Sequence, residues 1–269
     1  MPIKPMRALF LFAHQDDEYG VYAAIADCVQ RGLMVQCAYF TCGEGALAQQ
    51  RNQESLAVLA RLGVAASAVS FAGDQLAIAD ASLPQRLHDA GQWLEQWLLQ
   101  APQQHDELQQ LQHGGADSID SIYVTAWEGG HHDHDALHAL TCEIAARHGL
   151  LERVRQYALY NALGCPAPLF RVLSPLAQNG AVARQRLPWH QRWQHLRLCL
   201  MYPSQRNTWI GLFPFVVLHY LLRGEQQLQG VALARLQQRP HQGALYYENR
   251  RFYRWEQLQQ DLAQWRASR

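Results

Sequence analysis

Two patterns of hydrophobic and polar residues alternate along the first 165 residues of this chain. Short continuous apolar runs, typical of strands buried on both faces, are separated by longer segments with the amphipathic period of a helix. The predicted strands span residues 7–13, 33–41, 66–73, 119–126 and 154–162. The predicted helices span residues 18–32, 47–63, 83–100 and 134–149. Strands that alternate with helices form βαβ units, so we expect an α/β, Rossmann-like three-layer sandwich with a mostly parallel sheet.

The alternation of strands and helices is lost beyond Cys165. A Gln-rich loop is expected from about residue 101 to 116, and residues 166–269 form a basic, aromatic-rich elaboration that should pack on the core. We therefore expect 1–269 to be a single catalytic domain with its α/β core in 1–165. The longest apolar run, 209–222, is too short to span a bilayer. A buried helix is the main interpretation of this run, and a membrane-surface segment is the alternative.

Cysteine usage and the N-terminal segment both bear on location. The six cysteines include no C-x-x-C pair, which argues against a zinc ribbon or a thioredoxin motif and favours reduced, mostly buried thiols. The N-terminus carries basic residues and a short apolar run, but acids follow at once and no small-residue cleavage site is present. We interpret it as a first strand instead of a signal peptide, and expect a cytoplasmic protein.

Polar residues crowd the exit of the first predicted strand, in "ALFLFAHQDDEYG". Acids in the first turn of a helix are favoured by free backbone N–H groups and by the helix dipole. Capping of this kind explains one or two acids, with Glu18 as the best candidate for a cap. It does not explain His14 together with Asp16 and Asp17.

A second polar cluster, "GGHHDHDALH" (129–138), follows the fourth predicted strand. Asp133 is a good N-cap, which puts His134 in the first helical turn and His131 just before the helix. Ligand sites of parallel sheets lie outside the carboxyl ends of the strands, so both clusters should meet there. His138, one turn further on, is a weaker candidate ligand because helix packing also accounts for it.

Zinc suits this combination of imidazole and carboxylate groups. A hydrolytic zinc site needs three protein ligands and an open position for water. His14 and Asp17 can reach one ion, and a histidine of the second cluster completes the set. Asp16 is then left beside the metal, where a general base for the water molecule is expected.

Several segments of the chain together resemble one known family. "AHQDDE" resembles the A-H-P-D-D-E motif of the LmbE-like, or PIG-L, zinc-dependent de-N-acetylases, and "HHDH" resembles their H-P-D-H. "TCGEGALAQQRNQESLAVLARLG", "FAGD" and "MYPSQ" are similar to weaker motifs of the family, and the resemblance covers about 7–206. Gln15 and His132 replace the prolines of the two main motifs. His132 adds a competing candidate ligand.

The resemblance implies a role for each matching residue. Zinc would be held by His14, Asp17 and His134. Asp16 would be the general base. His131, oriented by Asp133, would stabilise the oxyanion or protonate the leaving amine.

The implied reaction is hydrolysis of a linear amide, which removes an acetyl group from an N-acetylglucosamine-type conjugate. Arg51 and Asp74 are candidate substrate contacts. Two alternatives stay open: the same zinc site could hydrate an unsaturated acid, or the chain could be a non-catalytic binding protein. We expect a small-molecule partner and no nucleic acid, and the sequence leaves room for an oligomer and for membrane-surface contact.

Charge is segregated along the chain. Residues 1–150 hold 18 acids against 7 Lys and Arg, whereas 151–269 hold 5 against 16. Nine arginines and no acid occur from Arg153 to Gly224. Such asymmetry points either to an anionic partner or to neutralisation of the acidic half. On the first interpretation, residues 184–209 bind an anionic or lipid-linked part of the conjugate through arginines such as Arg186 and Arg192, which are interleaved with Trp189, Trp193 and Trp209.

Overall fold

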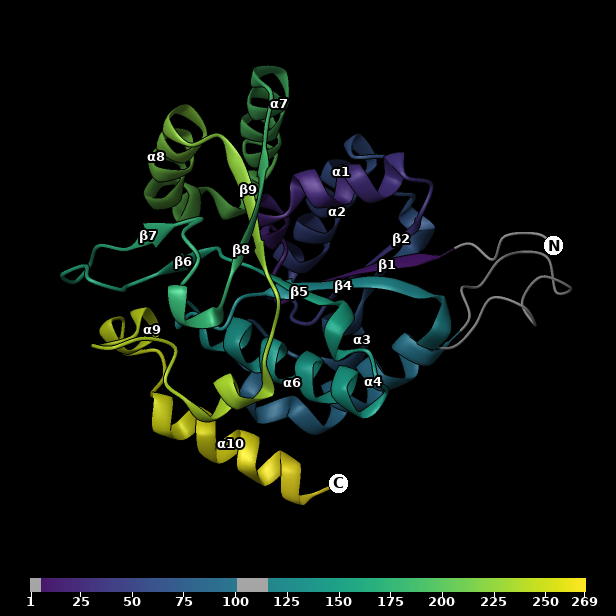
Figure 1. Ribbon diagram of the computed structural model, residues 1–269, viewed down its shortest axis with the longest axis vertical. Coiled ribbons are helices and arrows are strands. Elements are labelled where there is room, and N and C mark those ends of the chain that lie inside the picture. The colour runs from purple at the N-terminus through teal and green to yellow at the C-terminus, as the bar shows by residue number, and fades with distance from the viewer. Residues whose placement is uncertain (1–5, 101–115) are drawn as a thin grey trace, which may run out of the picture.

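A seven-stranded sheet forms the centre of the molecule (Figure 1). The computed structural model describes residues 6–100 and 116–269, so nearly all of the predicted Gln-rich loop lies outside the described residues. The strand order is β3-β2-β1-β4-β5-β9-β8. The strands are β1 (Arg7–Phe12), β2 (Met34–Tyr39), β3 (Val69–Phe71), β4 (Ile119–Thr125), β5 (Val154–Tyr157), β8 (Val182–Arg186) and β9 (Glu225–Gln229).

The first five strands of the sheet in chain order are parallel, while β9 is antiparallel to both β5 and β8. Helices cover both faces of the sheet (Figure 1), which confirms the predicted α/β three-layer fold. The helices are α1 (Tyr22–Gln30), α2 (Ala46–Arg61), α3 (Ala72–Leu76), α4 (Leu87–Leu99), α6 (His132–Arg147), α7 (Trp189–Cys199), α8 (Arg206–Leu222), α9 (Tyr246–Asn249) and α10 (Trp255–Ala267). A separate antiparallel pair is formed by β6 (Tyr160–Asn161) and β7 (Arg171–Val172).

The sheet divides the hydrophobic core in two. Phe10 and Phe12 of β1 face the core beneath α1, α2, α7 and α8, whereas Leu9 and Leu11 face the core beneath α4, α6 and α10. Side chains of a strand alternate between faces, so a strand covered on both sides must be apolar at every position. The continuous apolar run that predicted the first strand has this cause.

Two predicted strands end earlier than their apolar runs. The run 154–162 is divided, because β5 ends at Tyr157 and β6 pairs with β7 outside the main sheet. The run 66–73 yields only the short β3, after which α3 begins at Ala72. Gly73 there packs against the backbone of Thr41 so closely that a Cβ would lie 2.3 Å from its carbonyl carbon. This contact draws the segment after β3 towards the loop after β2.

The C-terminal elaboration contributes two strands to the sheet, which the hydrophobic pattern did not predict. The sequence of β9 is EQQLQ, and its glutamines are buried. Gln229 donates to the carbonyl oxygens of Leu176 and Gly180, and Gln226 accepts from the backbone N–H of Ala24. Buried polar side chains are tolerated when they are hydrogen-bonded, so this strand carries no apolar signature.

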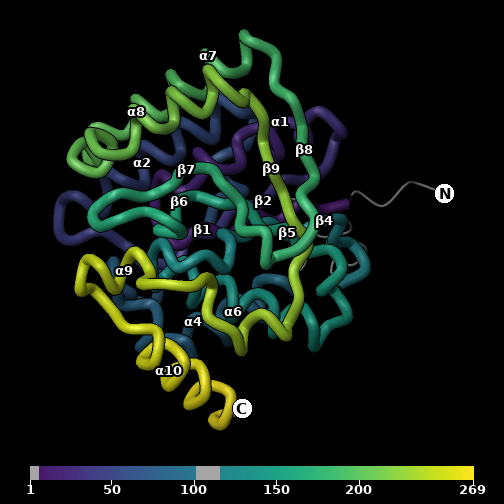
Figure 2. Tube along the Cα trace, turned by 60° about the vertical axis from the view of Figure 1, so that its left-hand side comes forward, coloured from purple at the N-terminus to yellow at the C-terminus, as the bar shows by residue number. Residues whose placement is uncertain are grey.

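The apolar run 209–222 does form a helix, within α8, but only one side of it is buried. In the described part of the chain, no helix is both long enough and apolar enough to cross a bilayer. All six cysteines are free and four are buried, as expected from their spacing. Figure 2 shows α7 and α8 packed along one side of the molecule and α10 at the other.

Candidate active site

The two polar clusters predicted from the sequence meet at one edge of the sheet. Strands β1 and β4 are parallel neighbours, so the loops that follow them leave the sheet side by side. The loop after β1 carries His14, Asp16 and Asp17, and the loop after β4 leads into α6 with His131 at its start. This edge is formed by the carboxyl ends of the parallel strands, where ligand sites of such folds occur.

His14, Asp17 and His134 converge on one point; we call them the inner group. Nδ1 of His14 lies 3.1 Å from Nε2 of His134, and that nitrogen lies 3.1 Å from Oδ1 of Asp17. Asp17 also accepts a hydrogen bond of 2.8 Å from the backbone N–H of His14, which fixes its carboxylate. One ligand atom from each residue lies within 4.8 Å of the others, and all three residues are buried.

The donor set of the inner group fits a zinc ion. Two imidazole nitrogens face each other at hydrogen-bond distance beside a carboxylate, an arrangement that a divalent cation satisfies directly. Two imidazoles and one carboxylate are also the ligands of catalytic zinc sites with an open fourth position. Burial acts to raise the pKa of Asp17, but His134 and His14 hold it below its usual value, so the carboxylate is in its ligating form.

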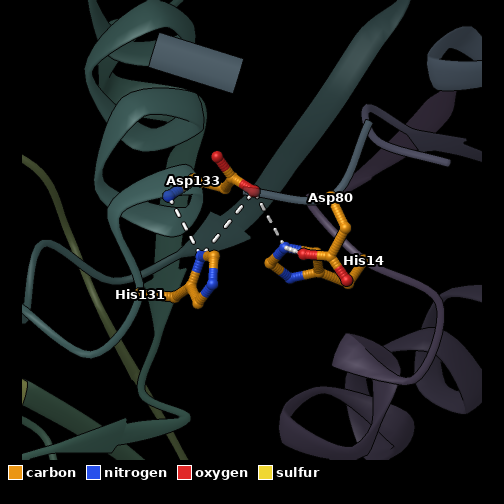
Figure 3. Close-up of side chains that lie close together, drawn as sticks. All are labelled: His14, Asp80, His131 and Asp133. Atoms are coloured by element: carbon orange, nitrogen blue, oxygen red, sulfur yellow. Dashed lines mark hydrogen bonds and ion pairs between the residues drawn. The ribbon is translucent and has the colours of Figure 1, made fainter. Parts of the chain in front are cut away.

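A second group gathers at the opposite nitrogen of His14 (Figure 3). Nε2 of His14 lies 3.0 Å from Oδ2 of Asp133 and 3.2 Å from Oδ1 of Asp80. His131 completes this outer group, with its ring centroid 4.6 Å from that of His14. Burial acts to lower the pKa of His14, but these neighbouring carboxylates raise it well above its usual value. Each ring nitrogen of His14 therefore faces a different set of groups.

Asp80 belongs to the site but was missed in the sequence. It follows α3 and is held at the sheet edge because Cys42 and Ala79 form a parallel bridge, in which Cys42 donates to Ile78 and accepts from Asp80. Its other carboxylate oxygen lies 3.1 Å from the guanidinium of Arg51. A lone acid in a loop gives no local signal. Only its place beyond the carboxyl end of β3 could have suggested it.

His131, and not Asp133, is the N-cap of α6, which corrects the sequence interpretation. Nδ1 of His131 accepts a hydrogen bond of 3.2 Å from the backbone N–H of Asp133. The carboxylate of Asp133 accepts instead from the backbone N–H groups of Ala81 and Leu83, at 2.7 and 3.0 Å. Burial, together with His14, lowers the pKa of His131 well below its usual value. A neutral ring whose Nδ1 accepts carries its proton on Nε2.

Asp16 occupies a strained position between His14 and Asp17 on the loop after β1. Its φ of 112° lies in a region that residues other than glycine rarely adopt. The residue is buried, and burial together with Asp17 and Glu18 raises the pKa of its carboxyl well above the usual value. The backbone of Asp16 thus departs from the helical conformation that begins at Asp17, and Asp16 is not a member of the inner group.

Glu18 does not cap α1, which begins only at Tyr22, so the sequence prediction is wrong for this helix. Its buried carboxylate accepts from the backbone N–H of Asp16 at 3.0 Å, from the hydroxyl of Tyr202 at 2.8 Å and from that of Tyr39. Burial raises the pKa of Glu18 to about 7 against the effect of these donors. Glu18 is therefore the anchor of the strained loop.

The "MYPSQ" segment (201–205) forms hydrogen bonds to the same loop. Besides Tyr202 on Glu18, Gln205 donates to the backbone carbonyl of Gln15 at 2.9 Å, and Ser204 binds Glu54. Gln15, which stands where the family motif has proline, donates to the side chain of Asn52 at 2.8 Å. Hydrogen bonds at Gln15 therefore hold the loop in place of a proline ring, which would restrict its backbone.

The remaining sequence candidates lie at different distances from the inner group. Arg51 forms an ion pair with Asp80, and Asp80 in turn contacts His14. Asp74 accepts a hydrogen bond from Asn52 on α2 and belongs to neither group. His132 is also outside both groups, because its Nε2 lies 3.0 Å from the carbonyl oxygen of Ala81 and its ring stacks on Tyr253.

His138 and Arg192 serve the fold. Nδ1 of His138 lies 2.8 Å from the carbonyl oxygen of Thr125, as expected for a residue that packs the helix. Arg192, a candidate anion-binding residue in the sequence, is buried and donates to the carbonyl oxygens of Leu187 and Tyr220 at 2.8 and 3.1 Å. Its guanidinium is committed to the backbone, so that part of the anion-binding hypothesis is wrong.

The buried His–Asp–His group lies at the carboxyl edge of the sheet, where α/β folds of this kind bind their ligands, and its donor atoms could hold a metal ion. The chain belongs to the PIG-L family, described as GlcNAc-PI de-N-acetylase, which matches residues 9–145. No curated protein sequence matches the chain significantly.

Solved structures with the same fold include several deacetylases. One is a triple mutant of a deacetylase of the teicoplanin biosynthetic pathway, with a TM-score of 0.61 and 18% identity over 84% of this chain and 98% of that one. Another is the A40926 pseudoaglycone deacetylase, with a TM-score of 0.58 and 16% identity over 84% and 97%. The N,N'-diacetylchitobiose deacetylase of Pyrococcus horikoshii gives 0.53 and 15% over 84% and 82%. At these identities the likeness shows the fold alone.

Proposed function

We propose that this protein is a zinc-dependent hydrolase that removes the acetyl group from an N-acetylated amino sugar within a larger conjugate. The observation that carries the proposal is the convergence of His14, Asp17 and His134, with Asp16 held separately on the same loop. Membership of the PIG-L family and the deacetylase activity named for three structural neighbours support the same reaction. In this proposal 1–269 act as one catalytic domain.

In the proposed mechanism, Asp16 accepts a proton from the attacking water molecule, and this proton passes to the amine nitrogen as the C–N bond breaks. His131 presents its Nε2–H to the oxygen of the amide that becomes negative, which is the geometry of an oxyanion stabiliser. The backbone N–H of Asp133 fixes the ring of His131 at Nδ1. When bound by the inner group, zinc would supply Lewis acidity, which polarises the amide carbonyl and lowers the pKa of water. Arg51 and Asp74 are proposed to contact the conjugate.

Metal binding tests the ligand assignment apart from the chemistry. Protein purified in the presence of zinc should carry one ion per chain, and His14→Ala and Asp17→Ala should each lose it. His190→Ala is the matched control, because it removes an exposed histidine that belongs to neither group. Stoichiometric zinc in either ligand variant would refute the assignment.

Replacement of the proposed base separates catalysis from metal binding. Asp16→Asn should keep zinc and lose roughly 10²–10⁴-fold in turnover, the usual effect of removing a general base. Release of acetate from N-acetylglucosamine conjugates is the measurement. If Asp16→Asn loses the ion and Asp17→Asn keeps it, the roles of the two aspartates are exchanged. A wild-type enzyme that binds zinc but releases no acetate from any such conjugate would count against the substrate class alone.

A further inference from the structure

Helix α8 presents an apolar face to solvent. Trp209, Leu212 and Val216 bury one side of the helix against the core. The opposite side is also apolar: Ile210 is 67% exposed and Leu222 is 75% exposed. Phe215, Leu218 and Leu221 lie on the same exposed surface.

A helix that is apolar all round is normally enclosed by protein or lipid. Contiguous apolar patches of this kind on an isolated chain mark surfaces that are covered in use. Within the described residues, Phe170 packs on Phe215 at one edge of this face, with 5.4 Å between ring centroids, while Ile210 and Leu222 stay exposed. The face contains no charged side chain between Arg206 and Arg223. The exposed face of α8 therefore requires a cover from outside the chain.

The charges around α8 indicate which kind of partner would cover its exposed face. Arg206 and Arg223 stand exposed at the two ends of the helix, and Arg197 is exposed on the neighbouring α7. Within the described residues, none of these three guanidinium groups makes a hydrogen bond or an ion pair, and the sequence has no acid from Arg153 to Gly224. A second copy of α8 packed against the first would bring like charges together. An anionic lipid surface instead satisfies both the apolar face and the arginines at its ends.

We propose that the exposed face of α8 docks on the surface of an anionic lipid bilayer. The helix would lie in the interface, with its leucines among the acyl chains and its terminal arginines at the lipid phosphates. With 17 residues, it is suited to lying on a membrane and not to crossing it. Figures 1 and 2 both place α8 beside β7 and on the opposite side of the molecule from α10, so docking would leave the rest of the chain free.

Docking would also orient the active site. A cavity of about 450 Å³ opens between β7 and α8, and Leu218 and Leu222 are part of its wall. Phe170 of the same wall contacts Tyr160, with 6.0 Å between ring centroids. Tyr160 in turn contacts His134 at 5.7 Å. These two contacts place the ring of Phe170 within about 12 Å of the ring of His134, so the cavity that meets the bilayer has one wall near the inner group.

Co-sedimentation of the full chain with vesicles tests the proposal. We expect binding to phosphatidylcholine vesicles that contain phosphatidylglycerol to be at least about tenfold tighter than to phosphatidylcholine alone, because three exposed arginines favour anionic lipid. Leu218→Gln with Leu222→Gln should weaken binding by about tenfold or more, since both leucines then remain in water. Leu99→Gln is the matched control, an exposed leucine at the end of α4, and should bind as wild type does.

Three results would overturn the proposal. The first is a wild-type chain that does not sediment with anionic vesicles. The second is equal binding by the Leu218/Leu222 double variant, with thermal unfolding showing that it is folded. The third is a wild-type dimer in light scattering that the double variant converts to a monomer, because a second copy would then be the cover. None of these results depends on deacetylase activity, so the proposed function is tested separately.

Discussion

His138→Asn should remove a measurable part of the acid sensitivity of this protein. His138 is buried in α6, with one ring nitrogen 2.8 Å from the carbonyl oxygen of Thr125 and the other 3.4 Å from Sγ of Cys142. Burial lowers the pKa of His138 to about 4. The amide nitrogen of asparagine can replace the donor to Thr125 and does not titrate.

The sign and size of the effect follow from proton linkage. The folded pKa of His138 lies below the unfolded value, so its neutral form favours the native state above the unfolded pKa. That contribution is lost as the pH falls through 6.5 towards 4. With these two values, the loss between pH 8 and pH 5 is about 2 kcal/mol of unfolding free energy. His138→Asn should lack this loss, whatever the substitution costs at pH 8.

Urea unfolding of both proteins at pH 8, 7, 6 and 5 measures the difference. The wild-type free energy of unfolding should fall by about 2 kcal/mol more than that of His138→Asn, with most of the divergence below pH 6.5. All other titrating groups are common to both proteins and cancel. Parallel curves would show that His138 binds a proton equally well in both states, and the argument from its burial would be refuted.

Four further substitutions test individual contacts. Arg192→Met should cost about 2–4 kcal/mol in urea unfolding, because two backbone carbonyls lose their donor; an unchanged midpoint would return this arginine to the anion-binding candidates. Gly130→Ala should weaken zinc binding in a titration, because its Cβ would lie 2.2 Å from a carbonyl oxygen of β6. Gly149→Ala, with φ of +68° and open space, should cost about 1–2 kcal/mol and leave zinc affinity intact. Tyr202→Phe should cost about 1–3 kcal/mol of stability by removing a donor from Glu18; no loss would mean that the bond contributes nothing.

The sequence alone determined the parallel part of the sheet and the approach of the two main loops. β1 is apolar from Ala8 to Phe12 and β4 from Ile122 to Val124 because both faces of the sheet are covered there, and that pattern is local. Parallel strands bring their carboxyl ends to one edge, so the clusters at His14 and His131 had to meet once β1 and β4 were neighbours. The placing of Asp16 apart from the inner group also agrees with the local sequence, since His14 and Asp17 are three positions apart and Asp16 lies between them.

Only the tertiary structure decided the contacts that residues distant in sequence make with one another. Asp80 reaches His14 through a bridge between two loops, and a single acid in a loop carries no periodic signal. The local sequence predicts a capping role for Glu18, because it gives no sign of Tyr202, the partner 184 residues away that donates a hydrogen bond to its carboxylate. The glutamines of β9 are buried because carbonyls elsewhere in the chain accept from them, which hydrophobicity does not record. Periodicity reports which face of an element is buried, whereas a polar side chain takes its role from partners that only the folded chain supplies.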